Sequence, residues 1–185
     1  MIFDIIKKRR SVFPVQYNDS PIAKEDIEKV LEAGNWAPNH KCTEPWRFKV
    51  IQGDAKKRLG IFLSKKYEEL DPKPKAMTVK KLQENPQMAS AIIAICMQRD
   101  PKESLPEWEE VAAVAMAVQN MWLQCTEMGI GSYWSSPGLI KYMDEFLSLN
   151  EGEKCLGFFY MGNFDGELTE GKREPIASKT EWITE

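Results

Sequence analysis

The sequence predicts an α+β sandwich in which helices flank a central sheet. Residues 89–97 form a continuous apolar run with polar neighbours, which is typical of a strand covered on both faces. Residues 46–51 alternate apolar with mostly charged side chains, as a half-buried strand does. Residues 105–128 repeat apolar side chains around most of a helix surface, which predicts a central helix or one packed against a second copy of the chain.

The first half of the chain contributes mainly helices. An apolar stretch followed by four cations predicts a short amphipathic helix over residues 2–10, with the cations suited to the negative end of the helix dipole. A proline and first-turn acids predict a helix over residues 22–34. A Gly-Asp pair predicts the start of a further helix at residue 54. The proline-spaced segment 71–86 includes a short expected helix at residues 77–84 and is a candidate flap.

The second half adds the remaining strands. Residues 133–136 have the pattern of a strand end, residues 139–149 are expected to form a helix, and residues 155–162 form another buried strand. The polar tail, residues 166–185, ends in an apolar pair that suggests an arm docked on a partner subunit. The count is about four strands among five or six helices, in a single domain over residues 1–185.

Composition excludes several classes of protein. A net charge of -3 and a pI near 5.5 argue against general nucleic-acid binding. No run of eighteen apolar residues is present, so no membrane span is expected. The four cysteines lie far apart and only one histidine accompanies them, which argues against zinc and against a disulfide framework. Reduced thiols in a cytoplasmic protein are the expectation.

Polar and aromatic side chains gather at three connections: residues 9–11, the proline-bounded loop 37–45, and residues 134–136. Each has an ordinary structural interpretation, either as a solvated helix end or as a turn. No G-x-S-x-G motif marks a hydrolase, and the G-x-G of residues 129–131 does not open a helix after a strand. The cations, hydroxyls and aromatic rings together suit a flat, anionic, conjugated cofactor that carries the chemistry.

These blocks, in this order, resemble the flavin-dependent nitroreductase family in its short form. The resemblance rests on Arg-Arg-Ser at residues 9–11, on residues 33–40 with 45–48, and on residues 128–131 leading to 134–136. It implies a nitroreductase-like sandwich with a central, mostly antiparallel sheet flanked by helices. It also implies that FMN binds at the interface of an obligate homodimer with an exchanged terminal arm.

The resemblance also implies how the flavin phosphate is held. Arg9, Arg10 and Ser11 are expected to grip the phosphate and the ribityl chain. Either Lys172 or Arg173 in the tail would add positive charge there.

The other carried-over residues surround the ring. Trp36 and His40 are expected to arrive from the other subunit, while Trp134, Ser135 and Ser136 would border the phosphate or the ring. Residues 124–129 correspond to the region where short members meet the nicotinamide cofactor.

The implied reaction is ping-pong electron transfer from NAD(P)H through FMN to a nitroaromatic, a quinone or a similar small acceptor. Neither a catalytic acid or base nor a metal is expected. Two alternatives stay open: related flavin chemistry on the same scaffold, such as enone reduction, dehalogenation or flavin breakdown, and a flavin-binding protein without turnover.

Overall fold

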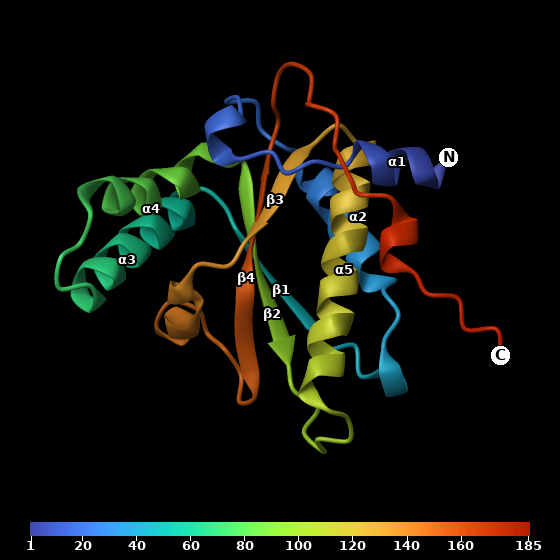
Figure 1. The fold of residues 1–185 in the computed structure, drawn as a ribbon. Coiled ribbons are helices and arrows are strands. Elements are labelled where there is room, and N and C mark those ends of the chain that lie inside the picture. Colours follow the sequence, from blue (N-terminus) through green and yellow to red (C-terminus); the bar gives the residue numbers. More distant parts are fainter.

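A single four-stranded sheet forms the centre of the molecule. The computed structural model describes all 185 residues. The strands are β1 (Trp46–Ile51), β2 (Ala91–Gln98), β3 (Gly131–Ser135) and β4 (Glu153–Gly162), ordered β1-β2-β4-β3 with every neighbouring pair antiparallel. Helices lie on both sides of this sheet (Figure 1). The expected α+β sandwich with an antiparallel sheet is confirmed.

Five α-helices surround the sheet. They are α1 (Ile2–Lys8), α2 (Lys24–Asn35), α3 (Asp54–Leu70), α4 (Ala76–Met88) and α5 (Glu107–Glu127). Short 3₁₀ helices occur at Pro14–Gln16, His40–Cys42, Gly138–Glu145 and Ile176–Lys179. The helices α2 and α5 lie on one side of the sheet, and the α3–α4 pair lies on the other (Figure 1). No helix combines the length and the hydropathy that a membrane crossing requires.

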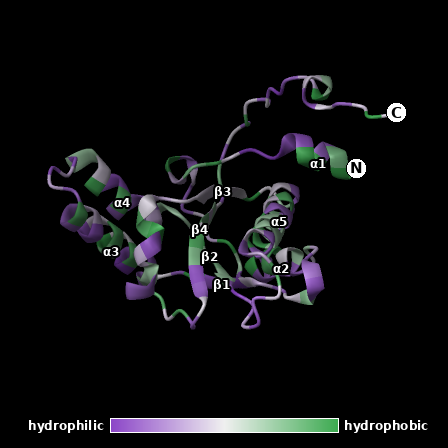
Figure 2. Cartoon of the chain, turned by 60° about the horizontal axis from the view of Figure 1, so that its bottom comes forward, coloured by the Kyte–Doolittle hydropathy of each residue, from purple (hydrophilic) through white to green (hydrophobic).

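Strand β2 joins two apolar layers because successive side chains of a strand point to opposite faces. Its residues 91–97 are all buried, as the continuous apolar run predicts. On one face Ile93 and Ile95 pack in a cluster with Val114 of α5, and on the other Ile92 packs in a cluster with Leu59 of α3. Figure 2 shows hydrophobic colouring where the strands cross the centre.

Helix α5 is only partly covered within one chain. Val114, Val118 and Met121 face the core, but Trp108 is 69% exposed and Met116 is 40% exposed. The expectation of a helix buried all round is therefore wrong for the single chain. The other alternative, that α5 packs against a second copy of the chain, stays a prediction.

Two expected helices differ in the structure. Residues 139–149 were expected to be α-helical, but the chain forms a 3₁₀ helix over Gly138–Glu145 that still buries Leu139 and Met143. Helix α4 does not end before Pro86 but continues through it to Met88. A proline in the last turn removes only one backbone hydrogen bond, so the helix tolerates it there.

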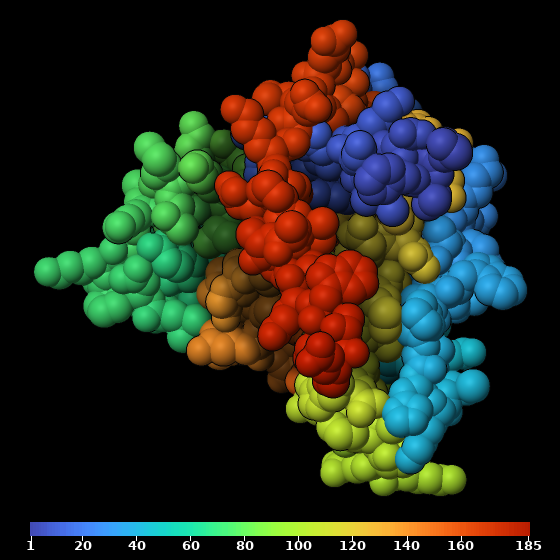
Figure 3. Space-filling view, turned by 45° about the vertical axis from the view of Figure 1, so that its right-hand side comes forward, coloured from blue at the N-terminus to red at the C-terminus, as the bar shows by residue number.

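The tail runs along the outside of the molecule. Figure 3 shows it in red, passing beside the blue N-terminal segment and running down the outer surface. Trp182 is 85% exposed and Ile183 is 84% exposed, so the terminal apolar pair has no cover within its own chain. The exchanged arm stays a prediction about a pair of chains.

Candidate functional site

A cavity of about 710 Å³ lies between the end of α1, the second half of α5 and the tail. Its lining carries four cations, Lys7, Arg9, Arg10 and Arg173, against one carboxylate, Glu170. No ion pair neutralises any of the three arginines. The cavity therefore concentrates positive charge and has the size of a small-ligand pocket.

Arg9 is the most informative of these cations. Its guanidinium lies over the indole of Trp122, 4.5 Å from the ring centroid. Burial, followed by the nearby charges of Arg173 and Arg10, lowers the pKa of Arg9 below its ordinary value. A bound anion would oppose this lowering of the pKa, because a nearby opposite charge favours the charged form of the guanidinium.

Trp122 is a site residue that the sequence analysis missed. Besides stacking under Arg9, its Nε1–H donates a hydrogen bond of 3.2 Å to the backbone carbonyl of Arg10. The helical spacing of apolar residues indicated only that Trp122 is one more apolar position of a buried helix. The sequence did carry one signal of a binding role: Trp122 is a large aromatic residue with an N–H donor, and it lies one helical turn from the polar Gln119.

Arg10 makes several hydrogen bonds within the chain. Its Nε donates to the carbonyl of Thr169 at 2.8 Å, and its Nη1 donates to the carbonyls of Lys7 and Arg9 at 2.6 Å and 2.7 Å. A Cβ atom at Gly171 would lie 2.7 Å from its guanidinium carbon. Arg10 thus fastens the tail to the end of α1, and its Nη2 is left for an anion.

The segment after the arginines runs beside β3. Ser11 is exposed, and the next residue, Val12, donates its N–H to the carbonyl of Ser132 at 3.1 Å. This bond joins the arginine cluster to the start of β3. Residues 134–136 follow within about 13 Å along the extended chain.

At the far end of β3, Trp134 and Ser135 are half-buried and Ser136 is exposed. The Nε1–H of Trp134 lies 3.4 Å from the carbonyl of Leu156, and the indole packs directly against Gly157, where a Cβ would collide with it. The indole is therefore fixed by the neighbouring strand.

The histidine loop is conformationally strained. His40 Nδ1 lies 2.6 Å from Glu109 Oε2, which ties the loop to the start of α5. Lys41, Cys42 and Glu44 all have positive φ angles, between 42° and 53°. Such backbone strain in non-glycine residues concentrates at functional sites.

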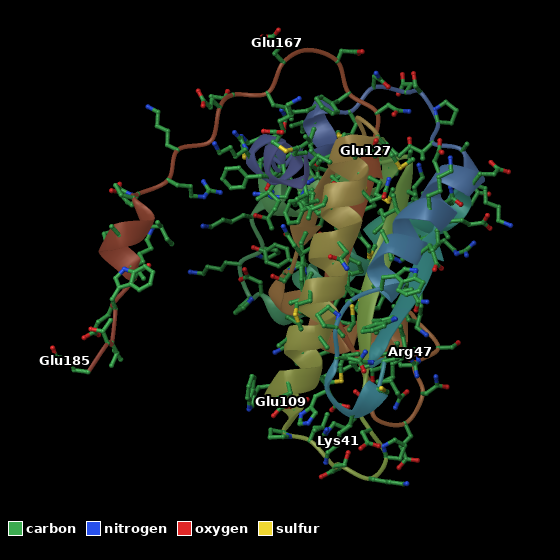
Figure 4. The ribbon with its side chains drawn as sticks, turned by 90° about the vertical axis from the view of Figure 1, so that its right-hand side faces the viewer. Lys41, Arg47, Glu109, Glu127, Glu167 and Glu185 are labelled. Carbon is green, nitrogen blue, oxygen red and sulfur yellow. The ribbon has the colours of Figure 1, made fainter.

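One chain does not bring Trp36 and His40 to the arginines. Trp36 is 79% exposed and donates to Glu32 at 2.7 Å, on the surface of α2. Figure 4 shows Glu109 at one end of α5 and Glu127 at the other. Glu109, the partner of His40, precedes Trp122 by thirteen residues, which is about 20 Å along the helix axis.

Known proteins resemble this chain in sequence and in fold. The family model described as "Nitroreductase family" matches residues 6–163. The chain is 29% identical over 182 residues to "Putative NAD(P)H nitroreductase YfhC" of Bacillus subtilis, covering 95% of this chain and 91% of that protein. A nitroreductase-like family protein from Bacillus cereus superposes with a TM-score of 0.85 at 30% identity, covering 99% and 96%. A Desulfovibrio desulfuricans structure in complex with FMN gives 0.76 at 22%, again covering 99% and 96%.

Proposed function

Because the chain belongs to the nitroreductase family, we propose that it is an FMN-dependent oxidoreductase that uses NAD(P)H to reduce nitroaromatics, quinones or similar small acceptors by a ping-pong mechanism. The name of the Bacillus subtilis relative supports the nicotinamide donor, and the FMN complex of the Desulfovibrio structure supports the flavin. The observation that carries the proposal is the group of arginines without carboxylate partners around the α1 cavity.

The donor set of this cavity fits a flavin phosphate. Arg9 donates no side-chain hydrogen bond within the chain, so its planar fork of N–H groups is available for two phosphate oxygens. Arg173 adds a second cation, and Arg10 keeps Nη2 free while it fastens the tail. The indole of Trp122 stacks on one face of the Arg9 guanidinium and so fixes its position.

When bound, FMN supplies the chemistry of accepting a hydride from NAD(P)H and delivering electrons to the second substrate. The residues of the chain bind and orient the FMN and neutralise its negative charge. The arginines hold the phosphate end, and the fixed indole of Trp134 with Ser135 and Ser136 offers an apolar surface and two hydroxyls at the other end of β3. No acid or base from this chain takes part in the proposal.

A homodimer would complete the site. The open stripe of α5 contains Trp108, Ala115, Met116 and Gln119, which share one side of the helix and are exposed. Two copies of α5 packed antiparallel through this stripe would bring the start of one helix to the end of the other. His40, which is tied to the start of α5 through Glu109, would then approach the arginines of the partner near the end of the other α5.

Anaerobic rapid mixing tests the proposed activity. Purified protein saturated with FMN is mixed with NADH or with NADPH, and the flavin absorbance near 450 nm is followed. Loss of the oxidised flavin band, and its return when a nitroaromatic or quinone is added, is the expected result. A flavin that neither nucleotide bleaches would contradict the proposal and favour a binding protein without turnover. A flavin that is bleached but returns only with an enone or a halogenated substrate would favour related chemistry on the same scaffold.

A further inference from the structure

Two of the four cysteines face each other across the centre of the sheet. Cys96 of β2 is the direct cross-strand partner of Cys155 of β4, and both are free thiols. The Arg99 N–H donates to the Gly152 carbonyl at 2.9 Å, which by the alternation of antiparallel ladders puts the cysteine pair at a non-hydrogen-bonded position. Opposed Cα atoms there are about 4.5 Å apart, within the roughly 4.4–6.8 Å that a disulfide spans.

The two thiols interact with each other and are not equivalent. The Cys155 thiol donates a hydrogen bond of 3.5 Å to the Gly157 carbonyl, and no such bond holds Cys96. Interaction with the Cys96 side chain lowers the pKa of Cys155 below its ordinary value, whereas interaction with Cys155, together with burial, raises that of Cys96. Cys155 therefore carries more thiolate than its neighbour, and the thiolate is the reactive form.

Cys155 is also the more accessible sulfur of the pair. It is 7% exposed and lines a surface hollow of about 490 Å³ together with Ile140, Leu149 and Lys154. Cys96 is completely buried beneath it. Of the two cysteines only Cys155 lines the hollow, so a small oxidant that enters it meets Cys155 before Cys96.

We propose that Cys96 and Cys155 are a redox pair that forms a reversible cross-strand disulfide on exposure to hydrogen peroxide. The Cys155 sulfur attacks one peroxide oxygen, so that an S–O bond forms, the O–O bond breaks and one water leaves. The Cys96 sulfur then attacks the sulfenic acid, forming the S–S bond, while the hydroxyl leaves as water with the Cys96 proton. Two thiols lose two electrons in total, and one peroxide becomes two waters.

The position of the pair links it to the candidate site. The ladder between β2 and β4 shifts register immediately beside Cys96, at the bulge that contains Leu156 and Gly157. This bulge supports the indole of Trp134 from the neighbouring strand. A covalent bond at Cys155 would therefore restrain the backbone that positions a proposed flavin contact.

Peptide mapping under non-reducing conditions tests the pair without relying on flavin or turnover. The full chain carrying Cys42→Ser, which removes the exposed thiol, is treated with hydrogen peroxide in native buffer, blocked with N-ethylmaleimide and digested with trypsin. The expected product joins peptides 82–99 and 155–172, and it disappears after dithiothreitol. The same product is expected when Cys125→Ser is added as a matched buried-cysteine control.

The chemistry assigned to Cys155 has its own readout. In the Cys42→Ser background, Cys96→Ser removes the resolving thiol, so peroxide is expected to leave a sulfenic acid at residue 155 that dimedone traps. Recovery of peptides 82–99 and 155–172 as separate maleimide adducts after peroxide treatment would overturn the proposal. So would a linked product that forms only in urea-unfolded protein, because the folded sheet would then not bring the sulfurs together.

Discussion

Replacement of Arg9 tests the assignment of the flavin phosphate. The Arg9 guanidinium donates no hydrogen bond within the chain, so Arg9→Ala is expected to remove the proposed phosphate contacts at the loss of its stacking on Trp122. Hydrogen bonds to charged groups are worth about 1.5–3 kcal/mol. At about 1.4 kcal/mol per factor of ten, we expect FMN to bind about 10- to 150-fold more weakly.

The assay is a titration of apoprotein into FMN with flavin fluorescence as the readout, repeated with riboflavin. Riboflavin lacks the phosphate, so its affinity is expected to be the same in the wild type and in Arg9→Ala. Arg9→Lys keeps the charge but loses the planar fork and its stacking, and an intermediate loss is expected. Lys8→Ala, which removes a neighbouring cation outside the α1 cavity, is the matched control and should bind FMN nearly as tightly as the wild type.

Two results would refute the reasoning. An unchanged FMN affinity in Arg9→Ala would show that Arg9 does not contact the phosphate. An equal loss for FMN and riboflavin would show that the substitution disturbs the ring or the fold instead.

Three further predictions follow. Trp122→Leu leaves Arg9 without its aromatic support and is expected to weaken FMN binding several-fold while riboflavin affinity is retained; equal effects on both ligands would count against a positioning role. Gly60→Ala puts a Cβ against the backbone of α4. We expect the free energy of unfolding to fall by about 1–3 kcal/mol, which should lower Tm by several degrees in a thermal melt. An unchanged or higher Tm would show that α3 and α4 can move apart without cost. Burial acts to raise the pKa of Glu153, but a hydrogen bond from the backbone N–H of Asn150 and the charge of Lys49 leave the pKa below its ordinary value. Its contribution to stability is therefore present above about pH 4.3 and is lost as the pH falls through the lower folded value. Urea melts should show Glu153→Gln less stable than the wild type at neutral pH, with the two converging in acid; a constant difference would contradict this.

The sequence predicted the sheet well because β2 has an unambiguous pattern. Seven consecutive buried apolar residues, 91–97, are hard to place anywhere except in a strand covered on both faces. Strand β1 was equally clear, since Trp46, Phe48 and Val50 alternate with other side chains. The limits of α4 and the 3₁₀ helix at Gly138–Glu145 were not predicted, because they depend on where a proline falls within a turn and on the space left between strands.

The candidate site was only partly predictable. The Arg-Arg-Ser block drew attention by charge and by resemblance, but nothing local distinguished the free guanidinium of Arg9 from that of Arg10, which binds backbone carbonyls. Their different roles depend on Thr169, a contact 159 residues away in sequence. Trp122 was missed for a similar reason, because helical spacing shows that a face is apolar but not which cation lies on it.

Each chain is proposed to bind one FMN through the arginines of the α1 cavity. The most direct test is the visible absorption spectrum of the protein after incubation with excess FMN and exhaustive gel filtration. We predict a retained flavin spectrum equivalent to one FMN per chain. A colourless protein fraction, with all flavin eluting as the free compound, would contradict the account.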